Sequence, residues 1–505
     1  MSALEMSRLQ FAVVTIYHYL FVPLSISLAA LTAGLHTAWW RTRDERWWRL
    51  ALVVGKLLMA TFAVGVVTGL VQEFQFGMSW SAFARFYGDV FGPTLAIEGM
   101  LAFFLEATFL GLWWFGRGRL GPRLHLATIW VVAVGTLISA YVILAANAFM
   151  QSPVGYTLDP VTHRAVLGSF SELLTNPVVL AAAPHTIAGA FASGGALVLA
   201  IGAWRAWGHG AERSWTEEGG HAAERSWTSG EGGRRTEGAD RGVWRSLARV
   251  GAWTTLLAGV ASALTGDALS RVMTTVQPMK MAAAEALYTT QAGAPYSLFA
   301  IGSPGSHEPA FSLDVPWLLS VLATGDPTAT VRGIDDLQAQ YAAQFGPGNY
   351  TPWIPVAYWS FRAMIGLGVL ATALAAWVLW RTRRGRDLTA TATATAPGWA
   401  GLADRALLRT LWLLPLLPTA AATFGWIFTE TARQPWLVFG LFRTSDGVSP
   451  TLTAGELALS LAGFALVYGA LALVWVRLVL HIARHDLPAA ASVEAAAAPE
   501  PVPSY

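Results

Sequence analysis

Long uninterrupted apolar runs constrain this chain more than any other feature of its sequence. Leu50–Val71 and Leu457–Val476 are clear examples, and each reaches the roughly 20 residues that a helix needs to cross about 30 Å of hydrocarbon. Of the 505 residues, 54% are hydrophobic and only 13% are charged, which is about half the charged share of soluble domains. The bilayer is therefore expected to be the solvent for most of the protein.

Nine such runs predict an all-α integral membrane protein, a bundle of nine transmembrane helices. An odd number of spans places the two termini on opposite sides of the membrane. Residues 1–271 would hold the first six helices and residues 355–487 the last three. The spans are expected at 10–36, 50–72, 93–115, 125–149, 178–204, 246–271, 355–380, 407–430 and 454–480.

Basic residues predict the orientation of this bundle. If the N-terminus lies outside, the inner segments and adjoining span ends hold 22 of the 33 Lys and Arg residues. Cytoplasmic loops carry the excess of Lys and Arg, so the N-terminus is expected outside and the C-terminus inside. Under this orientation the outer loops hold only Arg85, Arg164, Lys280, Arg332, Arg433 and Arg443.

The absence of cysteine limits the cofactors that the chain can hold. Disulfides, iron–sulfur clusters and covalently attached c-type haem all require thiols. A redox cofactor would then need His, Met or carboxylate ligands. The N-terminus has no basic region followed by a small-residue cleavage site, so no removable signal peptide is expected. The formal charge of +2 says little about partners, because the basic residues mark orientation, and no nucleic-acid partner is expected.

Three segments differ from the apolar background. Residues 208–243 form a Gly-, Glu-, Arg- and Ser-rich inner loop in which AERSWT at Ala211–Thr216 recurs at Ala223–Thr228. This loop and the Ala/Pro/Glu tail at 488–505 are expected to be disordered on the cytoplasmic side. The outer segment 272–354 is longer than most structureless loops, so it is expected to be functional or disordered. Its first part, Gln277–Glu285, is expected to form a helix.

Two histidines lie at similar depth near the outer ends of their spans, His18 in the first and His185 in the fifth. A lone histidine inside a membrane is more often a hydrogen-bonded core residue. A pair at one depth in a cysteine-free chain favours haem ligation, since imidazole is a usual axial ligand of haem iron. Met364 opens the seventh span at the same depth, where it either fills a gap or ligates haem. Its neighbour Arg362 would suit a haem propionate.

Buried carboxylates form a second group of candidates. Glu98 and Glu106 are eight residues apart in the third span, about 12 Å along a helix and about 80° around it, so both can face one seam. They are either neutral, hydrogen-bonded groups or a path that delivers protons, with Ser139 as a hydroxyl relay. Glu430 at the end of the eighth span is either a helix-end charge or part of a cofactor anchor with Arg433.

The chain has only two lysines, Lys56 and Lys280, among 31 arginines. Lys280 precedes Glu285 by five residues, which on a helix separates them by about 140°. They are either two unrelated charges or a couple that flanks a quinol, binds its hydroxyl and takes its proton.

These residues fall within segments that together, and in this order on nine spans, resemble subunit I of the cytochrome bd-type quinol oxidases along nearly the whole chain. The segments are SRLQF (Ser7–Phe11), YHYLFVPL (Tyr17–Leu24), GVVTGLVQEFQFG (Gly65–Gly77), GPTLAIEGMLAFFLEATFLGL (Gly92–Leu112), QPMKMAAAEA (Gln277–Ala286), FRAM (Phe361–Met364) and GWIFTETARQPW (Gly425–Trp436).

The resemblance implies two haems b, one low-spin and one high-spin, and one haem d. His185 and Met364 would ligate the low-spin haem b, and His18 and Glu430 the two high-spin haems, without deciding which of these is haem d. Glu98 would lie beside the oxygen-reducing haem as a further candidate metal ligand, with Glu106 and Ser139 on the proton path. The remaining implied cofactor and quinol contacts are Trp426 between haems, Arg362, Arg433 and Arg8 at propionates, and Lys280 and Glu285 in the quinol-binding loop 272–354.

The resemblance also implies the reaction and its setting. Quinol would be oxidised at the outer face of the bacterial cytoplasmic membrane, and O2 would be reduced to water at a di-haem site. Charge separation without pumping would follow, because protons would leave outside and enter from inside. A second membrane subunit, and small single-helix subunits beside it, are the expected partners. The loop between Lys280 and Arg362 is short, and the loop 208–243 has no counterpart in the family pattern.

Two other functions are compatible with parts of the sequence. A haem-b reductase that passes quinol electrons to another acceptor would contain only low-spin haems. A proton-coupled transporter would use the buried carboxylates, but it predicts an inverted repeat that the sequence does not contain. A haem–copper oxidase is disfavoured, because eight of the ten histidines lie in loops, tails or span ends.

Overall fold

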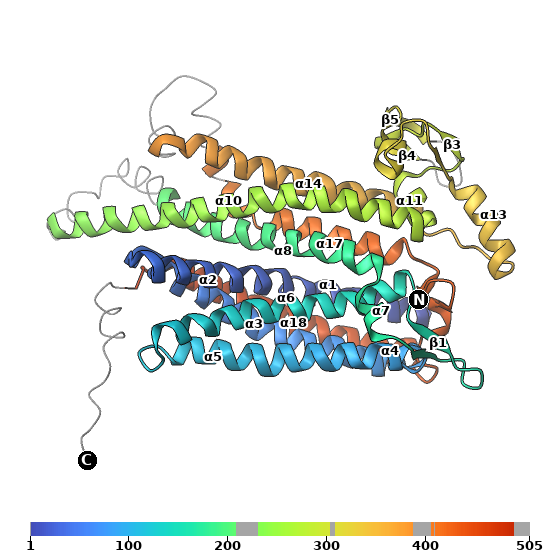
Figure 1. The fold of residues 1–505 in the computed structure, drawn as a ribbon, viewed down its shortest axis with the longest axis horizontal. Coiled ribbons are helices and arrows are strands. Elements are labelled where there is room, and N and C mark those ends of the chain that lie inside the picture. The colour runs from blue at the N-terminus through green and yellow to red at the C-terminus, as the bar shows by residue number, and fades with distance from the viewer. Residues whose placement is uncertain (1, 209–230, 303–308, 387–405, 409, 489–505) are drawn as a thin grey trace, which may run out of the picture.

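The computed structural model describes residues 2–208, 231–302, 309–386, 406–408 and 410–488. It is an elongated bundle of helices, with short two-stranded sheets and short connecting helices gathered at one end (Figure 1). The long elements are α1 (Ala3–Tyr19), α2 (Val22–Thr42), α3 (Glu45–Met78), α4 (Ser81–Gly99), η1 (Met100–Glu106), α5 (Ala107–Phe115), α6 (Pro122–Gln151), α8 (Pro177–Ala203), η2 (Trp204–Gly208), α10 (Glu231–Val276), α14 (Ile354–Thr382), α17 (Leu416–Thr431) and α18 (Ala454–Arg484).

The predicted all-α membrane fold is confirmed. Within the described residues, eight helices are long and apolar enough to cross a membrane. The count reaches nine if the pair Ala406–Leu413 and Leu416–Thr431, bent by 45°, forms one span. The first span combines α1 and α2, and the third combines α4, η1 and α5. The observed helices extend beyond the predicted spans at one or both ends.

Local sequence signals set the helix ends. Pro122 and Pro177 occupy first helical positions, where a missing N–H costs no hydrogen bond. Asn176 caps α8 by accepting a hydrogen bond from the Val178 N–H at 2.8 Å. Thr453 and Glu456 form a capping box at the start of α18. These caps satisfy N–H groups that a helix cannot pair internally.

The connecting segments at the end of the bundle that holds the N-terminus are compact. They comprise β1 (Tyr156–Leu158), β2 (Ala165–Leu167), α7 (Phe170–Leu174), α11 (Pro278–Glu285), β3 (Gln291–Ala292), β4 (Tyr296–Gly302), β5 (Pro309–Val315), α12 (Leu318–Thr324), β6 (Thr330–Val331), α13 (Ile334–Phe345), β7 (Trp436–Val438), β8 (Phe442–Arg443) and η5 (Thr444–Asp446). The helix expected at Gln277–Glu285 is present as α11. In its described part, the segment 272–354 is therefore an ordered set of short elements.

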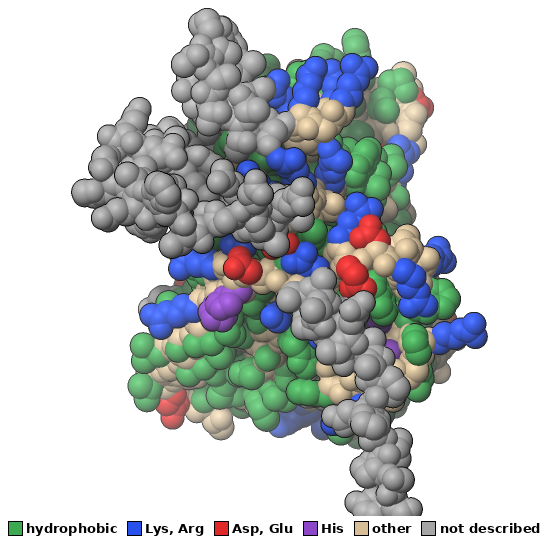
Figure 2. Space-filling model, turned by 90° about the vertical axis from the view of Figure 1, so that its left-hand side faces the viewer, with side chains coloured by type: hydrophobic (Ala, Val, Ile, Leu, Met, Phe, Trp, Pro, Cys, Tyr) green, Lys and Arg blue, Asp and Glu red, His purple; other side chains and the backbone are tan. Residues whose placement is uncertain are grey.

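The opposite end of the bundle is basic. Figure 2 looks onto this end and shows many Lys and Arg side chains there. Arg205 donates to Asp486 at 2.7 Å, and Arg49 donates to Asp240 at 2.7 Å. The first pair joins the end of α18 to η2, and the second joins the start of α3 to α10, at the end of the bundle opposite the N-terminus. The termini of the described chain thus lie at opposite ends of the bundle, as an odd number of spans requires.

The segment 208–243 was expected to be a disordered loop, but the structure shows a helix in its second part. Helix α10 begins at Glu231, inside this segment, and continues into the sixth span. Residues 209–230, and residues 489–505 of the expected tail, lie outside the described part of the chain. The helix extends beyond its apolar part because a formed helix adds further turns at little cost.

Helices α8 and α10 approach each other closely through glycines. A Cβ atom at Gly202 would lie 2.5 Å from the Ala248 nitrogen, and one at Gly251 would lie 2.7 Å from the Gly195 carbonyl oxygen. Small residues that let backbones approach are the usual means by which helices associate in membranes. This contact fixes the position of α8, which carries His185.

Gly251→Ala is expected to separate α8 from α10 and to destabilise the protein by about 1–3 kcal/mol, the usual cost of overpacking. Thermal unfolding of the purified complex, followed by the loss of helical circular dichroism, measures the effect. Gly242→Ala in the same helix is the matched control, because no atom lies within 4 Å of the added methyl group. Equal melting temperatures for the two variants would contradict the role of this contact.

Candidate functional site

The His18 ring is held with one nitrogen free. His18 lies in the last turn of α1, and its Nδ1 is 3.0 Å from the Thr68 hydroxyl. That hydroxyl donates to the carbonyls of Val64 and Gly65, which leaves its lone pair to accept a hydrogen bond from Nδ1–H. Nε2 then carries a lone pair, and no hydrogen bond to it is present in the described chain. This is the tautomer that a metal-ligating imidazole requires.

His185 on α8 shows the same arrangement. Its Nδ1 lies 3.1 Å from the Ser262 carbonyl oxygen on α10, which can only accept a hydrogen bond. Gly266, one turn further along α10, leaves room for the ring, since a Cβ there would lie 3.2 Å from Cε1. Nε2 of His185 is again the nitrogen left for a ligand.

Met364 and Trp426 lie where α14, α17 and α1 meet. A Cβ at Gly425 of α17 would lie 2.9 Å from the Met364 Sδ atom, so the thioether packs directly against this glycine and would have to shift for a larger residue. The next residue, Trp426, contacts the Tyr19 ring edge-on at 5.4 Å. His18 precedes Tyr19, so the structure brings these sequence-predicted residues to adjoining helix faces at the same end of the bundle.

Glu430 belongs to a polar network that joins three elements. Its carboxylate accepts a hydrogen bond from Asn147 of α6 at 3.0 Å and forms an ion pair with the buried Arg433. Arg433 also donates to the Leu437 carbonyl at 2.6 Å. Gln151, one turn beyond Asn147, accepts from Lys280 of α11. The last two turns of α6 thus link the eighth span to the start of the segment 272–354.

Asn147, Gln151 and Gln277 were not among the residues expected from the sequence. The Gln277 amide donates to the Gln151 carbonyl at 2.5 Å. The spacing of Asn147 and Gln151, four residues apart at the end of an apolar helix, is a signal that could have identified two of them. Their partners lie more than 100 residues away, so no local pattern predicts the contacts themselves.

Lys280 is almost completely buried in this network. Burial, with the neighbouring Arg433, lowers the pKa of the Lys280 ammonium to about 7, and Glu430 opposes this effect. Lys280 faces Gln151 and the Glu430–Arg433 pair. It therefore lies apart from Glu285, which faces the other side of α11, as their predicted angular separation of about 140° allows.

Glu285 forms a buried ion pair with Arg362 of α14, with Oε2 and NH2 2.6 Å apart. Arg362 also donates to the carbonyls of Ala284 and Ser297, and its guanidinium lies over the Tyr358 ring. Burial raises the pKa of Glu285 to about 7, and Arg362 opposes this effect. Arg362 was expected at a haem propionate; its partner in this structure is Glu285.

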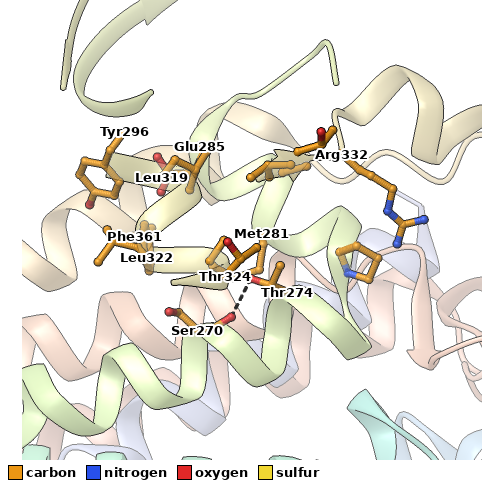
Figure 3. A pocket seen from close by; sticks show the side chains of 15 residues that line it. Ser270, Thr274, Met281, Glu285, Tyr296, Leu319, Leu322, Thr324, Arg332 and Phe361 are labelled. Atoms are coloured by element: carbon orange, nitrogen blue, oxygen red, sulfur yellow. Dashed lines mark hydrogen bonds between the residues drawn. The ribbon is translucent and has the colours of Figure 1, made fainter. Parts of the chain in front are cut away.

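A cavity of about 120 Å³ adjoins this ion pair (Figure 3). Glu285 and Tyr296 lie on one side of the view, Phe361 beneath them, and Ser270 and Thr274 of α10 below. Most of the wall is apolar, and Glu285 is its only acidic side chain among the described residues. Lys280 does not line it. The cavity can accept a flat ring with a hydroxyl directed at a carboxylate.

The carboxylates of the third span are brought together with one that the sequence analysis overlooked. Glu98 on α4 interacts with the carboxyl of Glu73 on α3 and with the Ser139 hydroxyl on α6. Glu106 is buried against Gly135 of α6, where an added Cβ would lie 3.3 Å from its Cγ. One Glu106 oxygen is buried without a hydrogen-bond partner in the described chain.

The helix between Glu98 and Glu106 departs from the geometry assumed for it. Met100–Glu106 is a π-helical turn, η1, so the expected rotation of about 80° for a regular α-helix does not apply. Such turns occur frequently at functional sites. The turn changes how the two carboxylates are rotated relative to each other, and both still contact α6.

Two basic candidates lie on the surface of the chain. Arg8 in α1 is exposed, and so is Lys56 in α3. Arg8 shares α1 with His18 but is ten residues before it, about 15 Å along the helix. Its expected role at a propionate stays a prediction.

The fold and the site define a class of protein. Membrane-spanning helices that present two imidazoles with free Nε2 atoms, a thioether and buried acid–base groups form a haem-binding membrane oxidoreductase. The residues present fit haem, because each imidazole is already held through Nδ1 in the tautomer that leaves Nε2 as ligand.

Comparison with known proteins gives the family. Residues 6–487 match the family described as cytochrome bd terminal oxidase subunit I. The chain is 36% identical over 497 residues to cytochrome bd ubiquinol oxidase subunit 1 of Bacillus subtilis, covering 97% of each chain. It is 33% identical over 515 residues to cytochrome bd-II ubiquinol oxidase subunit 1 of Escherichia coli, covering 91% of this chain and 92% of that one. The chain belongs to the cytochrome bd terminal oxidase subunit I family.

A solved structure agrees with this assignment. The bd oxidase from Geobacillus thermodenitrificans matches with a TM-score of 0.78 and 25% identity, covering 96% of this chain and 98% of that one. The protein is thus a haem-containing, multi-pass membrane subunit of a bacterial quinol:oxygen oxidoreductase that has other subunits. The expected family and reaction are confirmed. The two alternatives, a proton-coupled transporter and a haem-b reductase with another electron acceptor, are therefore excluded.

Proposed function

We propose that this subunit oxidises quinol at the cavity beside Glu285 and reduces O2 to water at a di-haem site within the bundle. The observation that carries the proposal is the pair of histidines, each fixed through Nδ1 with Nε2 free, together with a cavity that has Glu285 in its wall. His185 and Met364 would hold a low-spin haem b. His18 and Glu430 would hold a high-spin haem b and a haem d. When bound, the haems carry electrons from quinol to O2.

Glu285 is the group best placed to take a proton from quinol. It is the acidic side chain of the cavity, and Arg362 holds its carboxylate in position. Tyr296 and Phe361 supply aromatic walls for the ring. Lys280 faces the Glu430–Arg433 network, so we assign it a positioning role that ties α11 to the helix end bearing Glu430. Its direct contact with quinol stays a prediction.

Protons for water would come from the basic end of the bundle through Glu106, Ser139, Glu98 and Glu73. The basic end would face the cytoplasm, in keeping with the positive-inside rule. Quinol protons would leave at the opposite face, so charge separation needs no pumping step. The second membrane subunit and small single-helix subunits would cover the most exposed helices, α18, α14 and α4–α5.

A reduced-minus-oxidised spectrum and a carbon monoxide difference spectrum of the purified membrane complex test the haem assignment. A chlorin band at the red end that shifts with carbon monoxide is expected, together with a low-spin haem b that does not. A complex with only low-spin haem b, or without pigment, would overturn the proposal.

Glu106→Gln is expected to lower turnover and proton uptake from the basic side by a factor on the order of 10², since an amide cannot pass a proton. Proton uptake by vesicles with the complex in a known orientation measures it. Glu172→Gln, at an exposed carboxylate near the other end, is the control and should leave uptake unchanged. Unaltered uptake in Glu106→Gln would show that the path runs elsewhere.

A further inference from the structure

The β4–β5 hairpin of the outer segment has one apolar face, and this face is exposed. Phe299 pairs with Leu313 and Ile301 with Phe311 across the two strands. Side chains alternate along a strand, so these four share one face. Their exposed fractions are 39%, 55%, 51% and 57%. The described strands place no charged side chain on this face.

The opposite face is polar or small, which is the reverse of what a water-exposed hairpin needs. Ala300 and Ser312 pair there, and Ser312 donates to Asp314 at 2.7 Å. Hairpins on soluble domains direct the apolar face inward and the polar face to water. An apolar face of this kind marks a contact with protein or membrane.

The base of the hairpin is fixed to a membrane-spanning helix. The Ser297 hydroxyl lies 2.8 Å from the Tyr358 hydroxyl, and Arg362 donates to the Ser297 carbonyl at 3.0 Å. The Phe299 ring contacts Trp359 of α14 edge-on at 5.2 Å. These contacts set the apolar face beside the first turns of α14, at the end of the bundle where that helix begins (Figure 1).

The surroundings of this face are those of a membrane boundary. Trp317, Trp353 and Trp359 are all exposed here, and tryptophan is enriched at membrane–water interfaces. Further along α14, Val369 and Leu370 continue the exposed apolar surface into the span. The apolar face of the hairpin is therefore continuous with the exposed apolar surface of α14.

We propose that the apolar face of the β4–β5 hairpin lies in the adjoining bilayer leaflet and forms the lipid-side approach to the cavity. Tyr296, the first residue of β4, lines that cavity together with Phe361 of α14 (Figure 3). A lipid-borne quinol would slide along Phe299 and Trp359 toward Tyr296 and Glu285. The proposed lipid contact rests on the hairpin and the exposed apolar residues around it, and only the quinol route rests on the proposed function.

The cysteine-free chain permits a direct test of lipid contact. Phe311→Cys, Leu313→Cys and Val161→Cys each introduce the only thiol of this subunit, which is labelled with a nitroxide in the complete complex in a bilayer. Val161 is the control, because it is 85% exposed in the β1–β2 turn at the same end of the bundle. The unmodified complex gives the background from thiols on other subunits.

At positions 311 and 313, molecular oxygen, which concentrates in lipid, is expected to relax the label more strongly than a water-soluble nickel chelate. The reverse is expected at position 161. Relaxation by the chelate at 311 and 313 equal to that at 161 would place the face in water. Protection from both reagents would mean that another protein covers it. Either result would overturn the proposal.

A kinetic test addresses the quinol route separately. Ile301→Ser with Phe311→Ser should raise KM several-fold for a long-chain quinol supplied in the membrane, while KM for a short-chain, water-soluble quinol and kcat for both stay unchanged. Val161→Ser should alter neither. Equal KM changes for both quinols would overturn the route. An unmodified complex without quinol oxidation would instead contradict the proposed function and leave the labelling result standing.

Discussion

Replacing Glu285 by glutamine is expected to abolish quinol oxidation, lowering the rate by about 10²- to 10⁴-fold, the usual contribution of a positioned general base. An amide of the same shape cannot accept the quinol proton. The change also leaves the buried Arg362 guanidinium without its ion-pair partner. Quinol-dependent oxygen consumption by the purified complex measures the effect.

Loss of folding must be separated from loss of the base in this experiment. Breaking a buried ion pair costs about 3–5 kcal/mol, so haem content and melting temperature are measured in parallel. Asp336→Asn, at an exposed carboxylate in the same outer segment, is the matched control. A Glu285→Gln complex with full haem content and unchanged quinol oxidation would contradict the assignment.

The pH dependence of the same reaction follows from the environment of Glu285. Burial raises the pKa of this carboxyl to about 7, so below that pH the protonated form predominates and cannot accept a proton. Quinol oxidation should therefore fall as pH drops below about 7 and level off above it. Initial rates across neutral pH, with oxygen and quinol saturating, test this. A profile that is flat through pH 7 would contradict it.

His185→Ala is expected to remove the low-spin haem b and with it electron transfer from quinol to the oxygen site. A methyl group cannot replace imidazole as a ligand, whereas His18 and Glu430, the ligands proposed for the high-spin haems, are unchanged in this variant. Quinol oxidation should fall to background while carbon monoxide still binds the reduced complex. Met364→Leu, which preserves volume, should convert the same haem to a five-coordinate, high-spin form.

Reduced-minus-oxidised spectra of the purified variants provide the measurement. His485→Ala, at an exposed histidine at the other end of the bundle, is the control and should leave every band unchanged. Retention of the low-spin band in both the His185 and the Met364 variants would show that other residues ligate this haem.

Much of the fold could be predicted from the sequence, because in a membrane protein the position of each spanning helix depends on a short stretch of consecutive residues. Whether a stretch crosses the membrane depends on the composition of about 20 consecutive residues, and the spans appear where that composition predicts. Helix α11 was also predictable, since its proline start and alanine-rich body are local signals. The start of α10 at Glu231 was missed, because a formed helix extends into polar sequence that would not form one alone.

The candidate site was predictable as a set of residues but not as a set of contacts. An ionisable residue inside an apolar run is a functional candidate, because its burial in a membrane costs free energy. Glu98, Glu106, His18 and His185 were found in this way. Glu73 was overlooked because the sequence does not reveal that its side of α3 faces Glu98. The π-turn at Met100–Glu106 also changes the rotation of the third span, so the residues that share a face differ from those of a regular α-helix.

The sequence by itself determined that this is a membrane protein and gave the number of spans to within one. It also determined the unequal distribution of basic residues and the candidate ligands. Each of these depends only on residues that are near one another in the chain. Only the tertiary structure decided that Glu285 pairs with Arg362, that Lys280 turns instead to Gln151 and Glu430, and that an apolar hairpin lies beside α14. These contacts join residues distant along the chain. They depend on how each helix is rotated and placed against its neighbours, which packing across the whole bundle determines.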